Sequence, residues 1–314
     1  MTLKPGISIV FPVYNSSEIL PELARRLQEF RNSRDESVEV ILVNDGSRDN
    51  SWQVIQELIV EYNWITSINM MRNYGQHNAL LCGIRNATHE ITVTMDDDLQ
   101  HPPEEIPKLL GEIEAGMDVV YGPPIKQQNT LLRNAASRLT RIIFENSIGS
   151  RNARKVSAFR AFNTQMRDAF TDYNGPFVSI DVLLTWGSNR FSYIPVEYSP
   201  RFSGKSTYTF KKLMQHTFDL LTGFSTLPLQ IASLVGFGFT FFGLGVLIYV
   251  VGRYFIEGGS WPGFPFLAST IAIFSGAQLF TLGVIGEYIG RMHFRTMNRP
   301  AYVVREKYDA SIDE

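Results

Sequence analysis

The chain has 314 residues, with 29 basic and 31 acidic side chains and a formal net charge of −2. Charged residues make up 19% of it, below the roughly 25% of an ordinary soluble domain. Two segments, the 33 residues of Leu220–Gly252 and the 29 residues of Gly258–Gly286, contain no Asp, Glu, Lys or Arg. This division excludes a purely soluble chain as the default and also a transporter with many spans. The near-neutral balance gives no argument for nucleic-acid binding.

Length and cysteine content add further bounds. The roughly 220 residues of the soluble part are enough for one large core. The one cysteine, Cys82, excludes an intramolecular disulfide framework and fits a reducing compartment. The N-terminus has a short apolar run, Ile7–Val13, without a basic leader, so we expect no secretory signal.

The N-terminal part alternates between short apolar runs and amphipathic segments. Strands are expected at residues 7–13, 38–43, 66–70, 90–95 and 118–121. Helices are expected at residues 18–30, 50–62, 77–87 and 102–115. Ser16 and Ser17 are expected to cap the first helix. The alternation predicts an α/β fold, a parallel sheet with helices on both faces.

Polar clusters follow four of these strands, at the rim where ligands of such sheets bind. They are Pro12-Val13-Tyr14-Asn15, Asn44-Asp45-Gly46-Ser47, Asn73-Tyr74-Gly75 and Asp96-Asp97-Asp98. If the last segment stays extended, Asp96, Asp98 and Gln100 point to one side, which suits a divalent cation that also binds phosphate oxygens. Asp97 would then face away, and the alternative role for Asp98 is to cap the next helix.

The charge-free segments predict membrane spans at Leu227–Val251 and Phe266–Ile285, with two buried helices of a soluble protein as the alternative. The linker Gly252–Pro265 is rich in glycine and proline, so the pair should form a hairpin. Glycines in both spans are interpreted as packing faces that suit a homo-oligomer, or as flexible or lipid-facing positions. Lys211–Phe224 can form an amphipathic helix on the membrane surface, or an ordinary core helix.

Basic residues before the first span and after the second predict an integral protein of the cytoplasmic (inner) membrane. The catalytic domain and both termini would then be cytoplasmic. The expected domains are a catalytic domain at 1–209, a juxtamembrane helix at 210–226, a hairpin at 227–290 with helices at about 227–251 and 266–288, and a cytoplasmic tail at 291–314.

Four motifs resemble the inverting family 2 glycosyltransferases. They are Phe11–Asn15, Asn44–Ser47, Arg72–His77 and Asp96–Glu104. The last motif, together with Gly286–Arg291 after the second span, is similar to the bacterial polyprenyl-phosphate glycosyltransferases, relatives of dolichyl-phosphate mannose synthase. The resemblance implies a GT-A, Rossmann-like domain that binds a nucleoside-diphosphate sugar with Mg²⁺ or Mn²⁺.

The resemblance also implies roles for single residues. The donor-binding set would be Pro12, Tyr14, Asn15, Asp45, Asn73, Gly75, Arg133 and Lys205. The metal set would be Asp96, Asp98 and Gln100, and the catalytic set Asp96, Asp98, Arg201 and Asp181. Arg133 and Arg201 would face phosphates, although either can be a surface charge and Arg133 can instead face anionic lipid headgroups.

One departure concerns the acceptor region, where relatives commonly carry an aspartate just before a Phe-Arg pair. Here Arg154–Arg160 contains no acid. Asp181 could serve instead, or could cap a helix, or no base is needed because a lipid phosphate is already anionic. The loop at 204–208 reads Gly-Lys-Ser-Thr-Tyr, where relatives often have Gly-x-Ser-Lys-Tyr.

The expected reaction is metal-dependent, inverting transfer of one sugar from a nucleoside-diphosphate sugar, with UDP favoured, to polyprenyl phosphate for cell-envelope glycan modification. One alternative is a processive polysaccharide synthase, for which two spans are too few and the Gln-x-x-Arg-Trp motif is missing. The other is a non-catalytic, nucleotide-sugar-binding membrane scaffold, which the missing aspartate keeps open.

Overall fold

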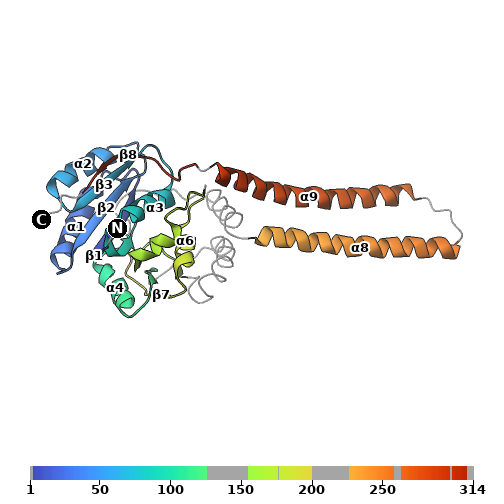
Figure 1. Cartoon of the computed structure of the whole chain (residues 1–314), viewed down its shortest axis with the longest axis horizontal. Helices are drawn as coiled ribbons and strands as arrows, with labels where there is room; N and C mark the ends of the chain where they lie inside the picture. Colours follow the sequence, from blue (N-terminus) through green and yellow to red (C-terminus); the bar gives the residue numbers. More distant parts are fainter. Residues whose placement is uncertain are drawn as a thin grey trace. The chain divides into compact units, whose positions relative to one another are not determined.

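The computed structural model describes residues 3–125, 155–175, 177–199, 226–257, 263–297 and 299–309. The chain divides into two compact units (Figure 1). The first unit joins Met1–Gln215 to Arg299–Glu314, and the second is His216–Asn298. The first contains the sheet and its helices, and the second contains two long helices.

The described part of the first unit forms an eight-stranded sheet in the order β7-β5-β6-β4-β1-β2-β3-β8. Its central strands are parallel: β1 (Lys4–Val13), β2 (Val38–Asn44), β3 (Ile65–Met70) and β4 (His89–Thr94). The outer strands are β5 (Val119–Tyr121), β6 (Arg160–Asn163), β7 (Phe191–Tyr193) and β8 (Val304–Tyr308). β6 is antiparallel to β4 and β5, and β8 is antiparallel to β3. The sheet is therefore mixed, and the expectation of a parallel sheet is wrong at these two strands.

The middle of the sheet is dry on both faces. In β1, every residue from Ile7 to Val13 is buried, and β1 pairs with β2 from Ile7↔Val38 to Val13↔Asn44. A strand covered on both faces has an unbroken apolar sequence rather than an alternating one. This explains why the apolar runs predicted β1 to β5 to within a few residues, while the other outer strands, β6, β7 and β8, gave no such signal.

Helices α1 to α4 follow the strands as expected. Their bounds are α1 (Leu20–Asn32), α2 (Ser51–Glu61), α3 (Gln76–Asn86) and α4 (Ile106–Glu114), the last preceded by the 3-10 helix η1 (Pro103–Glu105). The 3-10 helix η3 (Thr164–Phe170) and α6 (Ile180–Gly187) were not predicted.

The serine cap predicted for α1 is wrong. Ile19 occupies the N-cap position, and no side chain caps this helix. The backbone N–H groups of Ile19 and Leu20 instead donate to the carbonyl oxygen of Ser16, at 3.1 and 3.3 Å. The backbone turn at Ser16 therefore satisfies these donors, and the helix needs no serine hydroxyl.

The C-terminal segment returns to the sheet. β8 lies in the region expected to be a separate cytoplasmic tail, and it covers the edge of β3. The N–H of Met71 donates to the carbonyl oxygen of Val303 at 2.9 Å, and the rings of Trp52 and Tyr308 lie 6.3 Å apart. Pairing β3 protects an edge that would otherwise present unpaired backbone groups.

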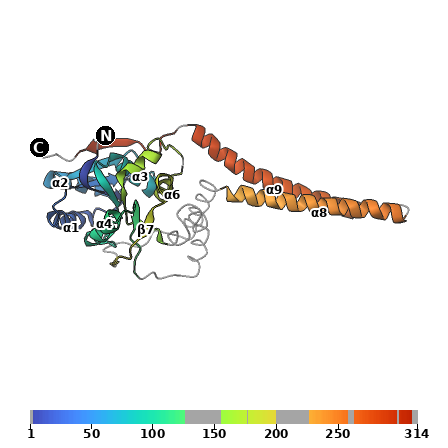
Figure 2. The ribbon, with the colours of Figure 1, turned by 60° about the horizontal axis from the view of Figure 1, so that its bottom comes forward.

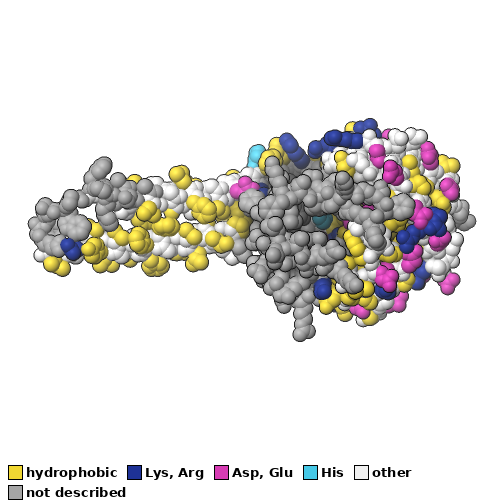
Figure 3. Space-filling model, turned by 180° about the vertical axis from the view of Figure 1, so that it is seen from behind, with side chains coloured by type: hydrophobic (Ala, Val, Ile, Leu, Met, Phe, Trp, Pro, Cys, Tyr) yellow, Lys and Arg dark blue, Asp and Glu magenta, His cyan; other side chains and the backbone are white. Residues whose placement is uncertain are grey.

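The second unit consists of α8 (Leu227–Glu257) and α9 (Phe264–Thr296), which lie side by side in Figures 1 and 2. Many hydrophobic side chains lie along the face of these helices that Figure 3 shows. The rings of Phe239 and Phe274 meet edge to face, with centroids 6.1 Å apart.

One helix among the described residues is long and apolar enough to cross a membrane. It is the 26-residue stretch Pro228–Arg253, which contains an 18-residue window with a mean hydropathy of 2.2. No residue of that window is buried inside the structure. The expected span in α9 does not meet the same criterion over the described residues. The expected juxtamembrane helix lies almost entirely outside the described residues.

Candidate active site

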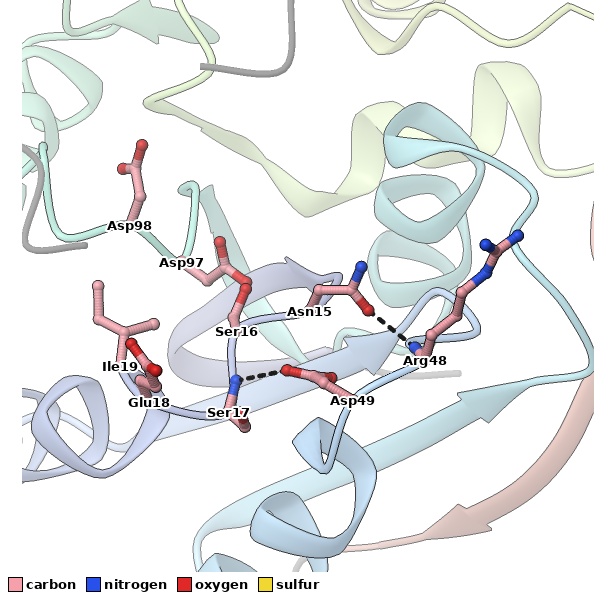
Figure 4. A pocket seen from close by; sticks show the side chains of 9 residues that line it. All are labelled: Asn15, Ser16, Ser17, Glu18, Ile19, Arg48, Asp49, Asp97 and Asp98. Carbon is pink, nitrogen blue, oxygen red and sulfur yellow. Dashed lines mark hydrogen bonds between the residues drawn. The ribbon is translucent and has the colours of Figure 1, made fainter. Parts of the chain in front are cut away.

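The predicted clusters lie in the loops that follow β1, β2, β3 and β4, at the carboxyl ends of the parallel strands. The loops after β1 and β2 are joined by hydrogen bonds (Figure 4). The side-chain oxygen of Asn15 accepts from the N–H of Arg48 at 2.8 Å, and the N–H of Asn15 donates to the Ser47 hydroxyl at 3.0 Å. Asn15 adopts a left-handed conformation with φ 55°, which asparagine tolerates better than most residues. Asn15 therefore links the two loops.

Asp45 links the loops after β2 and β3. Its carboxylate is buried and accepts from the N–H groups of Tyr74 and Gly75, at 2.6 and 2.9 Å. Burial raises the pKa of Asp45, against the lowering effect of these two N–H groups. Gly46 has a φ of 62°, and a Cβ there would approach the Asn73 nitrogen to 2.5 Å, so only glycine fits.

The remaining residues of the donor set have different surroundings. Pro12 is buried in β1 opposite Val43, whereas Tyr14 is 43% exposed and Asn73 is also exposed. A buried proline in a strand can only shape the wall of a site, while the two exposed side chains remain accessible from solvent.

The acidic motif turns sharply after β4. The backbone bends at Asp97 and Asp98, and Leu99 has a φ of 55°, so the segment does not stay extended. The side chains of Asp97 and Asp98 both line the same cavity (Figure 4). The expectation that Asp97 faces away is therefore wrong, because it assumed an extended backbone.

The three carboxylates of this motif have different roles. Asp96 Oδ1 accepts from Gln76 Nε2 at 2.6 Å, and Asp98 Oδ1 accepts from the N–H of Gln100 at 3.1 Å. Asp98 thus closes its own turn rather than capping a helix. The Oδ2 atom of Asp97 is buried and has no hydrogen-bond partner within the described ranges. Burial, aided by the two neighbouring aspartates, raises the pKa of Asp97 to about 7.

The cavity at this rim measures about 560 Å³. It is lined by Asn15, Ser16, Ser17, Glu18, Ile19, Arg48, Asp49, Asp97 and Asp98. Of these, Asn15 and Asp98 belong to the predicted site residues. Asp97 lies inside the predicted acidic cluster, and the others directly follow the first two clusters, so extending these clusters by a few residues toward the next helix would have found them.

The oxygen-rich lining is compatible with a divalent cation. Mg²⁺ is usually held by one or two carboxylates together with substrate phosphates and water. No group of three acidic, histidine or cysteine side chains among the described residues could hold a metal ion by itself. The oxygen atoms of this lining therefore fit a cation that is shared with a bound diphosphate. They do not fit a metal site made of protein ligands alone.

Asp181 does not reach this cavity as an open carboxylate. It lies in the first turn of α6, only 8% exposed, and forms an ion pair with Arg160 of β6, which is 2% exposed. The N-cap of α6 is Ser179, so Asp181 is not the cap either. Arg133, Arg201 and Lys205 lie outside the described residues.

Comparison with known proteins identifies the family. Residues 8–173 match the family described as Glycosyl transferase family 2. The chain is 36% identical over 304 residues to the undecaprenyl-phosphate 4-deoxy-4-formamido-L-arabinose transferase of Shewanella sediminis (strain HAW-EB3), covering 96% of this chain and 92% of that protein.

Among solved structures, the chain resembles glucosyl-3-phosphoglycerate synthase from Mycobacterium tuberculosis. The crystal structure with Mn²⁺, UDP and glucosyl-3-phosphoglycerate superposes with a TM-score of 0.53 at 15% identity, over 69% of this chain and 78% of that one. The structure of the same enzyme with UDP gives a TM-score of 0.50 at 15% identity, over the same shares of the two chains. These likenesses confirm the GT-A, Rossmann-like fold. The chain therefore belongs to glycosyl transferase family 2 and is a glycosyltransferase.

Proposed function

We propose that this enzyme transfers a single sugar, with inversion, from a nucleoside-diphosphate sugar to undecaprenyl phosphate or a similar polyprenyl phosphate. The product would be a polyprenyl-monophosphate sugar for cell-envelope glycan modification. The observation that carries the proposal is the 36% identity over 96% of the chain to a transferase whose name specifies undecaprenyl phosphate. An exposed apolar helix in the same chain supports a lipid acceptor.

On the donor side, the proposed nucleotide is UDP and the proposed cofactor is Mg²⁺ or Mn²⁺. The solved structures of the same fold contain UDP and Mn²⁺, and the acidic cavity of this chain suits such a cation. Asp98, which lines the cavity, would hold it together with Asp96 and Gln100 of the same turn, and it would neutralise the diphosphate leaving group. Asp45 and Asn15 would support this site by holding the loops after β2 and β3 in place.

On the acceptor side, a phosphate monoester is already anionic near neutral pH, so it can attack the sugar carbon without losing a proton to a base. A new bond from the phosphate oxygen to carbon forms as the bond from carbon to the diphosphate oxygen breaks, which inverts the anomeric centre. The engagement of Asp181 by Arg160 supports this base-free reaction. Arg133, Arg201 and Lys205 remain proposals for phosphate contacts.

The membrane arrangement is also a proposal. The 26-residue apolar stretch of α8 would be one span, and α9, packed along it, would be the second. The basic flanks of the hairpin would then keep the catalytic domain and both termini in the cytoplasm. The glycine-rich faces of both helices would allow copies of the chain to associate.

The first experiment is transfer of radiolabelled sugar from a panel of UDP- and GDP-sugars to undecaprenyl phosphate in membranes. We expect one sugar per lipid in the organic phase. A polymer would indicate a processive synthase. The absence of any lipid-linked product from the whole panel would favour a nucleotide-sugar-binding scaffold.

A matched pair of variants tests the metal role. Asp98→Asn should lower transfer by at least ~100-fold, because it weakens charge stabilisation of the leaving group, and should leave membrane insertion intact. Asp35→Asn, the same change in an exposed turn, should have no effect. Full activity of the Asp98 variant, or of the wild type in chelator, would contradict the metal role.

A further inference from the structure

A buried ion pair lies directly beside the acidic motif. Arg160, the first residue of β6, pairs in register with Thr94 of β4 on one side and with Tyr121 of β5 on the other. Its guanidinium contacts the carboxylate of Asp181, in the first turn of α6. Both side chains are almost fully buried, at 2% and 8% exposure. The pair therefore joins α6 to the end of β4, two residues before Asp96.

On one side, the pair holds the segment that precedes β6. Arg160 Nε donates to the carbonyl oxygen of Ala158 at 3.4 Å, and the hydroxyl of Thr94 donates to the same oxygen at 3.0 Å. The N–H of Phe159 donates to the hydroxyl of Ser157 at 3.3 Å. This is the segment without an acid in the acceptor region, and Arg160 and Thr94 fix its backbone against the strand that leads to the acidic motif.

On the other side, α6 is tied back to the same motif through α3. The N–H of Ile180 donates to His77 Nδ1 at 3.3 Å. The residue before His77 is Gln76, whose side-chain amide donates to Asp96 at 2.6 Å. From Asp96, these contacts run through α3 and α6 to Asp181 and Arg160, and they return through Thr94 to Asp96. The ion pair is the contact between α6 and β6 that closes this ring.

Stability alone is a weak reason for such a pair. Removing two charges from water is costly, and apolar residues of similar size often replace a buried ion pair with little loss of stability. A charged pair does, however, prescribe one geometry, which loosely directional apolar contacts do not. The ring of contacts that includes this pair reaches Asp96. It also reaches residues 155–160, the described part of the segment without an acid, which we call the acceptor segment.

We propose that Arg160 and Asp181 are positioning residues for sugar transfer. They hold the Ala158 carbonyl and α6 against the acidic motif, so that the acceptor segment keeps its place relative to the bound donor. This inference rests on the proposed function. It assigns Asp181 a different role from proton abstraction, since its carboxylate serves as the partner of Arg160.

The central experiment uses the full-length enzyme in detergent or membranes with the double variant Arg160→Met/Asp181→Val, which removes both charges and roughly preserves the combined side-chain volume. We expect a melting temperature close to that of the wild type. We also expect UDP affinity within about twofold of the wild type, because the hydrogen bonds of the pair among the described residues run to Ala158 and not to the loops after β1 and β2. The kcat should be about 100-fold lower at saturating substrates. A wild-type kcat in the double variant would overturn the proposal.

Two further variants complete the test. Arg160→Lys keeps the positive charge beside Asp181 and loses the Nε contact to Ala158. It should lower kcat without changing UDP affinity. If the double variant does not fold, Arg160→Lys replaces it as the test, and an unchanged kcat of Arg160→Lys overturns the proposal. Glu22→Gln/Arg25→Gln removes a half-exposed ion pair of 2.7 Å on the surface of α1 and should leave kcat unchanged.

The failure of this inference can be told apart from the failure of the proposed function. If the wild type forms no lipid-linked sugar with any donor, the proposed function fails, while UDP affinity can still be measured. If the wild type transfers sugar and the double variant transfers it equally well, the proposed function stands and the positioning role is wrong.

Discussion

Strand β1 and helix α8 contain the same kinds of side chain in opposite surroundings. Phe11 and Val10 of β1 are 0% exposed, whereas Phe241 and Val250 of α8 are 71% and 42% exposed. In the catalytic domain, the sheet and its helices remove apolar side chains from water. In α8 and α9, apolar side chains stay exposed within the described part of the chain. Lipid would be a suitable environment for such a surface. Hydrophobic composition therefore forms a core in one unit and an exposed apolar surface in the other.

The two regions also differ in their buried polar groups. The catalytic domain buries Asp45, the Arg160–Asp181 pair and the Glu39–His89 contact, and each makes specific hydrogen bonds. The stretch Leu220–Gly252 contains no charged residue at all. The stability of the catalytic domain should therefore depend on pH, while the helicity of α8 should not respond to pH.

The largest expected effect comes from truncating one phenylalanine in each region. Phe11→Ala should lower the free energy of unfolding of the catalytic domain by ~3–5 kcal/mol, since it opens a cavity in the core. Phe241→Ala should change it by less than ~0.5 kcal/mol, because that side chain packs into no core. Urea unfolding of the detergent-solubilised chain, followed by tryptophan fluorescence, measures both. Equal losses would mean that α8 is a core helix, and the comparison would fail.

A second pair of variants tests the packing of the hairpin. A Cβ on Gly243 would approach the ring of Phe274 to 2.6 Å, whereas nothing lies within 4 Å of one on Gly245. Gly243→Leu should destabilise the contact between α8 and α9 by about 1–3 kcal/mol through overpacking, and Gly245→Leu should be tolerated. Cysteine crosslinking between the two helices in membranes reports the contact. Similar crosslinking in both variants would show that this face is not the packed one.

The smallest expected effect concerns acid. Burial alone would raise the pKa of Glu39, but hydrogen bonds from His89, the Ser8 hydroxyl and the Thr88 N–H outweigh burial and lower it. A carboxyl with a lowered pKa stabilises the fold above its ordinary pKa, and this contribution is lost as the pH falls through the folded-state value. Glu39→Gln should therefore lower stability at pH 7 by about 1 kcal/mol and reduce the loss of stability in acid.

Urea midpoints of the catalytic domain between pH 7 and pH 4 measure this effect, with the exposed Glu36→Gln as the matched control. An acid dependence equal to that of the wild type would assign the sensitivity to other carboxylates. Helicity of the hairpin over the same pH range should stay constant, which would sharpen the contrast between the two units.

Local patterns predicted much of the fold and the rim of the site. Unbroken apolar runs identified β1 to β5, because strands covered on both faces need no polar residues. The polar clusters after four strands predicted one ligand-binding rim, and the structure places those loops together and joins them through Asn15 and Asp45. The metal and donor roles of these residues remain predictions, since they depend on ligands.

Other features could not be predicted because distant segments decide them. β8 has an almost wholly polar sequence and becomes a strand only because the edge of β3 offers backbone partners. The position of Asp97 depends on a turn that the extended-strand argument did not include. Asp181 gave the local signal of a base or a cap, yet Arg160, 21 residues earlier, engages its carboxylate.

The sequence by itself determined that this chain has a charged part and a charge-free part, and that polar clusters follow the parallel strands of the charged part. Composition and strand periodicity are local properties, and the solvent acts on each residue directly. Only the tertiary structure decided which carboxylates face the cavity and which are engaged as partners of other side chains. Those assignments depend on contacts between residues far apart in the chain, which no local pattern records.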